Sequence, residues 1–372
     1  MDGLIRSVFV STDGYLKKFR MSLPREFARY THSRVAVVSA EARKSGRNLL
    51  SFAERDHDEE LLLRNLPLHW NQSQKFNFWN KRLLSFLKNY HPHLIVWQGY
   101  IGSLEYLQIL TYRFLYSPET LLVVEMTNPH LTWWNRLLAF PGFLNARDGL
   151  IYFSEPYSRM VKPPGNKLRS TVIHPSANLQ VFRPRTLPEL RDRFNPESGL
   201  LIGIFAHHFK PSLLEWLEFA FNVEGLKLMV FQDNRYPPNP IIHKVAAMYE
   251  SEIIINYTHE EFAQYLNSLD GFLWGPVVSP TLERESLQTA AEIMASGLPL
   301  ICSDHPFNRQ LFEGGAVFYD PIDPLEVRMK LQVLRESPSY RRRLGWQARQ
   351  LAELRFSPKE NAERLVEFCQ DF

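Results

Sequence analysis

The stretch RESLQTAAEIMASGLPLI, residues 284–301, decides the fold of this chain. Its first part has apolar residues at helical spacing, and Gly297 follows as a residue that commonly ends a helix. The apolar run over residues 298–302 then predicts a buried strand. A helix that leads directly into a buried strand is typical of a parallel sheet with helices packed on its faces.

The same alternation of short apolar runs and helical patterns extends outward from this stretch. Because the runs are uniformly apolar, they indicate parallel strands that are covered on both faces. We predict an α/β fold with doubly wound sheets. The predicted strands are residues 7–11, 34–39, 93–97, 121–125, 149–153, 200–205, 226–231, 252–255, 271–274, 298–302 and 316–319. The predicted helices are residues 22–30, 78–89, 213–221, 260–266, 286–296, 324–335, 340–354 and 358–368.

A proline-rich segment of mixed charge, residues 178–198, interrupts the alternation and suits a linker between two α/β units. We expect a first domain over residues 1–180, a linker over 181–198 and a second domain over 199–354. Residues 355–372 are expected to form a terminal helix that returns to the first domain. Ligands of such folds bind at the carboxyl ends of the strands, so the expected site lies in a cleft between the two domains.

Composition excludes several classes of protein. The 43 Lys and Arg residues nearly balance 40 Asp and Glu residues, unlike the large basic excess of a dedicated nucleic-acid binder. No apolar run reaches the roughly 20 residues that span a bilayer, and we expect no signal peptide. Two cysteines cannot build a disulfide framework or a four-cysteine zinc site, and we expect no metal. A reducing cytoplasm is the expected location.

Mixed basic and aromatic segments occur at residues 79–84, 133–138 and 341–343. Amphipathic helices of this kind can rest on anionic membranes, so peripheral membrane contact is one interpretation. The alternative is a helix with one buried stripe and a solvated rim. Both interpretations stay open at this point.

The helix of residues 286–296 carries the first candidate site. Ser286 is expected to cap its N-terminus, which is a favourable place for an anion. Glu292 shares one helix face with Gln288 and Thr289, which precede it by four and three residues. A carboxylate there can accept hydrogen bonds from two ribose hydroxyls, and the alternative is a solvated helix glutamate.

Several motifs in this half of the sequence resemble those of one enzyme family. The segment EIMASGLPLI resembles the family's E-A-M-A-x-G-x-P-V-I, and the other segments resemble its V-I-P-N-G, F-x-P, P-x-D-P and F-S-W motifs. The matching segments are residues 292–301, 172–176, 182–184, 320–324 and 356–358. Over residues 170–372 the chain therefore resembles the retaining nucleotide-sugar glycosyltransferases of family 4, whereas the first half matches only in architecture.

The resemblance implies a GT-B fold, in which two Rossmann-like domains face a central cleft. It implies that the second domain binds a nucleoside-diphosphate sugar as donor substrate, without a cofactor, and that the first binds the acceptor. It further implies transfer to an acceptor hydroxyl with retention and without a metal. The acceptor class stays open between a glycan, a lipid-linked molecule and another biopolymer.

The donor residues follow from the same resemblance. Glu292 occupies the position of the family's ribose-binding glutamate. Thr289, on the same helix face, is also expected to bind the donor. The backbone amides of Ser286, Leu287 and Gln288 occupy the stretch that contacts the diphosphate. The family's sugar-binding glutamate lies eight residues before the ribose-binding one, and this chain has Arg284 at that position. Glu285 is the next residue along the chain, and either residue could face the donor.

A second motif, GIFAHHFK at residues 203–210, resembles the family's Gly-Arg, five residues and Lys. Gly203 and Lys210 fall in register, and Lys210 is expected to stabilise the leaving diphosphate. Ile204 stands where the family has Arg, so one cation is missing from a group that must stabilise a departing anion.

Three residues are candidates to replace that cation, namely Arg284, His207 and His208. We hypothesise that Arg284 supplies the lost charge. The alternative for the two histidines is ordinary packing in a loop or core.

Weaker candidates lie in the first half. His130 follows an apolar strand, as does a histidine that approaches the transferred sugar in the family. Gly14 is the candidate for a glycine that lets the backbone approach the donor. Asp13 is the candidate for acceptor contact, with a simple turn carboxylate as the alternative.

Other functions remain open. Ile204 and the late Glu285 fit a catalytically weak relative that serves as a binding subunit. The local basic segments allow a phage-type glycosyltransferase that acts on modified DNA bases, although the small net charge does not favour it. A nucleotide-sugar epimerase of the same fold is a further option.

Overall fold

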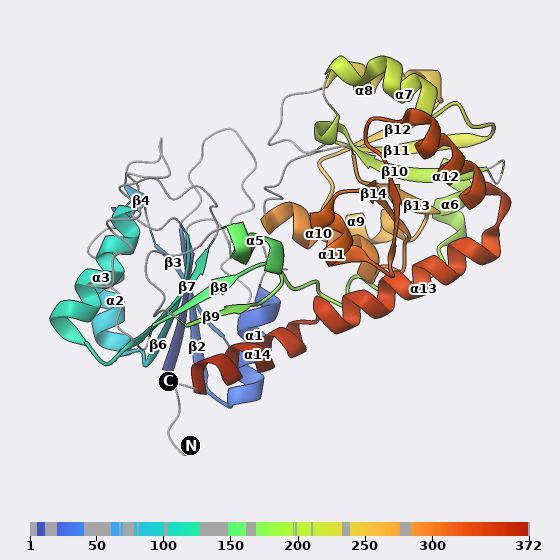
Figure 1. Ribbon diagram of the computed structural model, residues 1–372. Helices are drawn as coiled ribbons and strands as arrows, with labels where there is room; N and C mark the ends of the chain where they lie inside the picture. The colour runs from blue at the N-terminus through green and yellow to red at the C-terminus, as the bar shows by residue number, and fades with distance from the viewer. Residues whose placement is uncertain are drawn as a thin grey trace. The chain divides into compact units, whose positions relative to one another are not determined.

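The computed structural model divides the chain into two compact units, unit 1 of Met1–Ser176 with Pro358–Phe372 and unit 2 of Ala177–Ser357. Each unit has its own parallel sheet (Figure 1). The structure describes residues 6–11, 21–40, 61–66, 68–69, 78–79, 82–99, 103–126, 148–160, 169–195, 197, 199–209, 211–232, 239–275 and 284–370. The side chains of residues 284–286 lie outside this description.

Unit 1 is built on a seven-stranded sheet in the order β3-β2-β1-β6-β7-β8-β9, with every neighbouring pair parallel. The strand order reverses between β1 and β6, which is the point where doubly wound sheets bind ligands. The strands are β1 (Arg6–Ser11), β2 (Arg34–Ala40), β3 (Leu61–Leu66), β6 (Leu94–Gly99), β7 (Leu121–Met126), β8 (Gly149–Tyr152) and β9 (Arg169–Val172). The helices are α1 (Ser22–Thr31), α2 (Arg82–Tyr90), α3 (Leu104–Tyr116), α5 (Glu155–Met160) and α14 (Pro358–Gln370).

The C-terminal helix α14 packs against α1 in unit 1, which confirms the predicted return of the chain to its first half (Figure 1). Phe27 and Leu365 share one buried cluster with Phe9 of β1. The Asn361 Nδ2 atom also donates to the carbonyl oxygen of His174, at 2.8 Å. Apolar burial and this hydrogen bond together fix α14 on the sheet.

Unit 2 repeats the architecture with a six-stranded parallel sheet in the order β12-β11-β10-β13-β14-β15. Its strand order reverses between β10 and β13. The strands are β10 (Leu200–Phe205), β11 (Leu226–Gln232), β12 (Glu252–Ile255), β13 (Gly271–Leu273), β14 (Leu300–Ser303) and β15 (Ala316–Tyr319). The α-helices are α6 (Pro188–Phe194), α7 (Leu214–Ala220), α8 (Pro240–Met248), α9 (His259–Leu266), α10 (Arg284–Ala295), α11 (Pro306–Phe312), α12 (Pro324–Glu336) and α13 (Pro338–Arg355).

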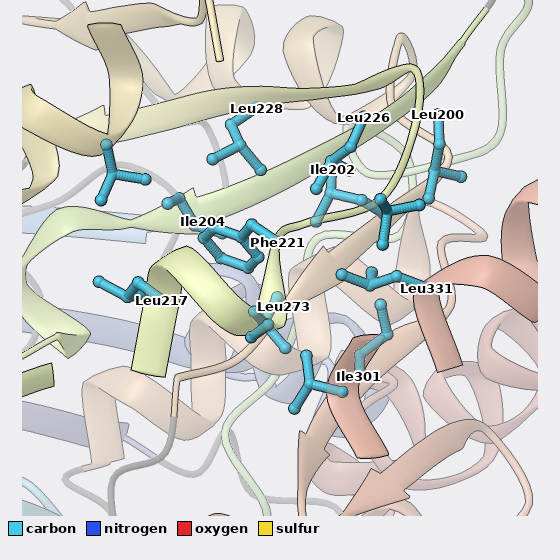
Figure 2. Close-up of a cluster of buried hydrophobic side chains, with 14 of the residues drawn as sticks. Leu200, Ile202, Ile204, Leu217, Phe221, Leu226, Leu228, Leu273, Ile301 and Leu331 are labelled. Carbon is cyan, nitrogen blue, oxygen red and sulfur yellow. The ribbon is translucent and has the colours of Figure 1, made fainter. Parts of the chain in front are cut away.

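One face of the unit 2 sheet forms a continuous apolar core with α7, α8 and α12 (Figure 2). Ile202 and Ile204 point from β10 toward Leu217 and Phe221, which belong to α7 and the turn after it. All four of these side chains are fully buried. The buried Ile204 gives a packing reason for an apolar residue at the position where the resembling family has Arg.

The two doubly wound sheets confirm the predicted α/β fold, but some predicted elements differ. The helix predicted over residues 78–89 begins only at Arg82, because Phe78–Trp79 form the short strand β5, antiparallel to β4 (Leu68–His69). Ser286 is the third residue of α10, so its prediction as the helix cap is wrong. Helices α3, α5, α6, α8 and α11 and strands β3, β4, β5 and β9 were not predicted.

The segment predicted as a linker contains helix α6. The Arg191 guanidinium of α6 donates to the Asp270 carboxylate at 2.8 Å and to the carbonyl oxygen of Ser268 at 2.9 Å. These bonds hold the segment on unit 2. Among the described helices, none has the length and apolar composition to cross a membrane.

Candidate functional site

The candidate site lies in unit 2, where the strand order reverses at the carboxyl ends of β10 and β13. Residues that follow such strand ends are the usual ligand contacts of doubly wound sheets. Here His207 and His208 follow β10, and Trp274 and Gly275 follow β13. A Cβ atom on Gly275 would lie 2.7 Å from the Cβ atom of His208, so only glycine lets the two segments approach this closely.

Aromatic side chains cover this end of the sheet. Phe205, the last residue of β10, lies 5.8 Å from Phe231 of β11 and 6.0 Å from Trp274, measured between ring centroids. Phe262 of α9 packs against Phe205 at 5.9 Å. We call Phe205, Phe231 and Trp274 the aromatic row. Its rings sit at separations typical of favourable aromatic pairs.

His208 is buried beside the aromatic row, with its ring 4.6 Å from that of Trp274. Burial lowers the pKa of the His208 imidazole well below its usual range, and His207 adds to this fall. The His208 imidazole is therefore neutral at pH 7 and does not supply the cation that the sequence lacks at Ile204. This finding removes His208 from the three candidates for that charge.

Glu292 lies in the second half of α10, and the residue is only 3% exposed. The Gln288 Nε2 atom, one turn earlier, donates to Glu292 Oε1 at 3.2 Å. The interpretation of Glu292 as a solvated helix glutamate is therefore wrong. Buried carboxylates are stable only where hydrogen bonds hold them, so this residue has a fixed orientation.

A third residue, His259, joins Glu292 from the neighbouring helix α9. The His259 Nε2 atom lies 3.8 Å from Glu292 Oε1, and the His259 and Phe182 rings form a T-shaped pair with centroids 4.5 Å apart. A capping box between Thr258 and Glu261 starts α9 and so sets the position of His259. We call Glu292, Gln288 and His259 the Glu292 cluster.

Sequence reasoning predicted Glu292 and Gln288 but missed His259. The signal was present, because the letters THEE at residues 258–261 match a capping box and place a histidine in the first turn of a helix. What the sequence could not show is that this turn lies beside α10. A carboxylate that Gln288 orients and His259 flanks can accept hydrogen bonds from ligand hydroxyl groups.

The other predicted donor-binding residues that the structure describes differ in how deeply they are buried. Leu287 is fully buried and Thr289 half-buried on α10. Gly203 lies inside β10, where a Cβ atom would approach Leu269 and Phe272 to 2.6 Å, so close packing accounts for the glycine. Four of the predicted residues lie outside the described part of the chain, namely Asp13, Gly14, His130 and Lys210. For Arg284, Glu285 and Ser286 the structure describes the helical backbone but not the side chains.

Among the described residues, no three His, Cys, Asp or Glu side chains lie together in a way that could hold a metal ion. The two cysteines are both free, with Cys302 buried in β14 and Cys369 half-buried in α14. Burial raises the pKa of the Cys369 thiol to about 12. Neither thiol is therefore ionised at neutral pH.

By sequence, no protein-family model and no curated protein matches this chain. Solved structures do match it. Sucrose-phosphate synthase from Thermosynechococcus elongatus superposes with a TM-score of 0.72 at 14% identity, over 99% of this chain and 98% of that chain. A glycosyltransferase from Rickettsia africae gives 0.72 at 13% identity, over 99% and 98%. HepE from Anabaena, solved with UDP and glucose, gives 0.69 at 13% identity, over 99% and 100%.

These similarities cover nearly the whole of each chain, although the sequences are only 13–14% identical. The solved relatives are GT-B glycosyltransferases, and this chain has the GT-B fold, as the sequence predicted. Within that fold, unit 2 contributes the Glu292 cluster and the aromatic row. The finer assignment to family 4 stays a prediction.

Proposed function

We propose that this protein is a glycosyltransferase that moves a sugar from a nucleoside-diphosphate sugar to an acceptor hydroxyl. The observation that carries the proposal is the Glu292 cluster, a buried and oriented carboxylate on α10 of a GT-B fold. A carboxylate in this state suits the two hydroxyls of a ribose, because both can donate to it. The Anabaena HepE structure with UDP and glucose supports a nucleotide sugar as the ligand of this fold.

The proposed reaction needs stabilisation of the departing diphosphate. The bond between the anomeric carbon and the diphosphate breaks, and a bond to the acceptor oxygen forms. The acceptor proton passes to the diphosphate that leaves. On the resemblance to family 4, the new bond forms on the same face of the sugar, which gives retention without a metal.

Residues outside the described part complete this proposal. Lys210 and the first amides of α10 would stabilise the diphosphate, since cations and helix N-termini both favour phosphate groups. Glu285 and His130 would orient the sugar. Because His208 is neutral, Arg284 becomes the stronger candidate for the missing positive charge. We propose the cytoplasm as the location, which suits two free cysteines.

A ligand screen followed by a product assay tests the proposed function. The full chain is heated with UDP-, GDP-, ADP- and dTDP-sugars in turn, and its melting temperature is recorded. Binding to the folded state alone raises this temperature. We expect at least one nucleotide sugar to do so, and the same donor to release free nucleoside diphosphate slowly in the presence of protein.

The control variant Glu292→Gln keeps the size of the side chain and removes its charge. We expect it to lose most of the thermal shift. If no nucleotide sugar stabilises the wild-type protein, or if none releases nucleotide, the proposed activity is wrong and only the fold remains.

A further inference from the structure

A row of buried polar side chains crosses the carboxyl end of the unit 1 sheet. Ser11 of β1 is paired in register with Ser39 of β2 and with Gln98 of β6, and Gln98 is paired with Glu125 of β7. Paired residues of neighbouring parallel strands point to the same face of a sheet. We call these four residues the polar row, and none of them is more than 5% exposed.

The polar row replaces an apolar pattern at this level of the sheet. Two residues earlier in three of these strands, the same face carries Phe9, Val96 and Val123, which belong to the core beneath α1 and α14. The change from apolar to polar occurs where the strand order reverses, between β1 and β6. Burial of polar groups costs free energy unless they form hydrogen bonds, and a ligand bound at this position could supply those bonds.

Gln98 of the polar row has one side-chain atom with a hydrogen-bond partner and one without a partner among the described residues. Its Nε2 atom donates to Glu125 Oε2 at 2.9 Å, so the amide has a fixed orientation. Its Oε1 atom is buried, and no described residue donates a hydrogen bond to it. A buried acceptor without a donor destabilises a fold, which favours an external donor at this atom.

A second buried atom of the same kind lies on the neighbouring helix α5. The Tyr157 ring packs on Phe153 with centroids 4.1 Å apart, and no described residue forms a hydrogen bond with its Oη atom. Burial, then Tyr152 and the charge of Glu125, raise the pKa of Tyr157, so its hydroxyl keeps its proton. Among the described residues, the region around Glu125 therefore holds one acceptor and one donor without a hydrogen-bond partner.

We propose that the polar row binds hydroxyl groups of a neutral, sugar-like acceptor, with one hydroxyl donating to Gln98 Oε1 and another accepting from Tyr157 Oη. A sugar hydroxyl both donates and accepts, so it matches both atoms. The carboxylate of Glu125 disfavours an anionic group such as a phosphate at the same place. This inference rests on the proposed function, because it gives the acceptor of that reaction a chemical class and a place.

Ligand-observed NMR with simple sugars tests the inference. Saturation transfer from the full-length protein is recorded for the methyl glycosides of glucose, mannose and galactose, with UDP present. We expect a signal for at least one glycoside with the wild-type protein. Gln98→Met and Tyr157→Phe should each reduce that signal about fivefold, which corresponds to the loss of one hydrogen bond.

Thr171→Val is the matched control. Thr171 of β9 lies in the same register as Glu125, two strands away, and the substitution removes one hydroxyl without changing size. We expect it to keep the glycoside signal. Tyr157→Phe removes a single oxygen atom, so it remains informative if Gln98→Met fails to fold.

The outcomes separate the two proposals. If UDP binds but no glycoside does, or if both variants keep the wild-type signal, the polar row does not bind the acceptor. If UDP and all other nucleotides fail to bind, the proposed function itself fails. Loss of the signal in both variants, with UDP binding retained, supports the inference.

Discussion

The two units share a strand order but bury different chemistry at the carboxyl ends of their sheets. In unit 1 the first strand along the chain, β1, has Ser11 of the polar row as its last residue. In unit 2 the corresponding strand ends at Phe205, within the aromatic row. The polar row lies on the face that α1 covers, whereas Phe205 packs against Phe262 of α9.

This difference indicates that the aromatic row contributes to stability, whereas the polar row is suited to binding. Aromatic rings at a strand end stabilise the fold by burial and need no partner from outside. Polar groups at the same place are favourable only when each finds a hydrogen bond, and Gln98 Oε1 lacks one among the described residues. Unit 2 also buries Gln232 and Ser303 at the ends of β11 and β14, and it carries a further buried polar group on its helices, the Glu292 cluster.

The largest effect is expected in the aromatic row. Phe205→Ala removes a side chain that is 5% exposed and leaves a cavity, so the free energy of unfolding should fall by about 3–5 kcal/mol. Ser11→Ala, at the same strand position in unit 1, removes one hydroxyl and should cost about 1 kcal/mol. Urea denaturation of both variants measures the difference. Equal losses would mean that the two strand ends do not differ in their role in stability.

Acid should destabilise unit 2 through His208. Its pKa is lowered in the folded chain, so below the unfolded value near 6.5 the unfolded chain binds a proton that the folded chain does not. The stability from the neutral ring is complete above that pH and is lost as the pH falls toward the folded pKa. We expect a loss of up to about 1.4 kcal/mol per pH unit.

His208→Phe serves as the control for this pH dependence. Urea denaturation of both proteins at pH 7, 6 and 5 should show a steeper loss for the wild type, because the variant has no group to protonate at this position. Parallel curves would contradict the neutral, buried state of His208.

A smaller effect is expected within the Glu292 cluster. Gln288→Leu keeps the volume on α10 and removes the hydrogen bond to Glu292, so the carboxylate loses part of its orientation. The dissociation constant of the nucleoside diphosphate that the screen selects should rise about threefold to tenfold, equivalent to about 0.7–1.4 kcal/mol. Titration calorimetry measures it, with Gln350→Leu on the exposed side of α13 as the control. An unchanged constant would show that Gln288 does not orient Glu292.

The sequence predicted the central strands well and the edge of one sheet poorly. Strands such as β10 have uninterrupted apolar runs because helices cover both faces. The missed strands β3 and β9 are the two edges of the unit 1 sheet, where Arg64 is exposed and the letters RSTV contain no apolar run. Edge strands bury less surface, so they lack the pattern that identifies a buried strand.

Some residues of the candidate sites could be predicted from local sequence, whereas others could not. Glu292 and Gln288 could be paired from their helical spacing, because four residues make one turn. His259 and the polar row depend on which helices and strands are neighbours, and that information is in the register and not in the local sequence. Ser286 was misplaced because helix ends are less marked in a sequence than helix faces.

The proposed function requires Glu292 to bind a ribose, and one set of four binding measurements tests this role. The dissociation constants of the nucleoside diphosphate selected by the screen and of its 2′-deoxy form are measured with the wild type and with Glu292→Gln. We predict that the wild type prefers the ribose form about tenfold, since a hydrogen bond to a charged group is lost in the deoxy form. In the variant this preference should fall to about twofold or less. The same tenfold preference in both proteins would contradict the account, because the ribose would then be recognised elsewhere.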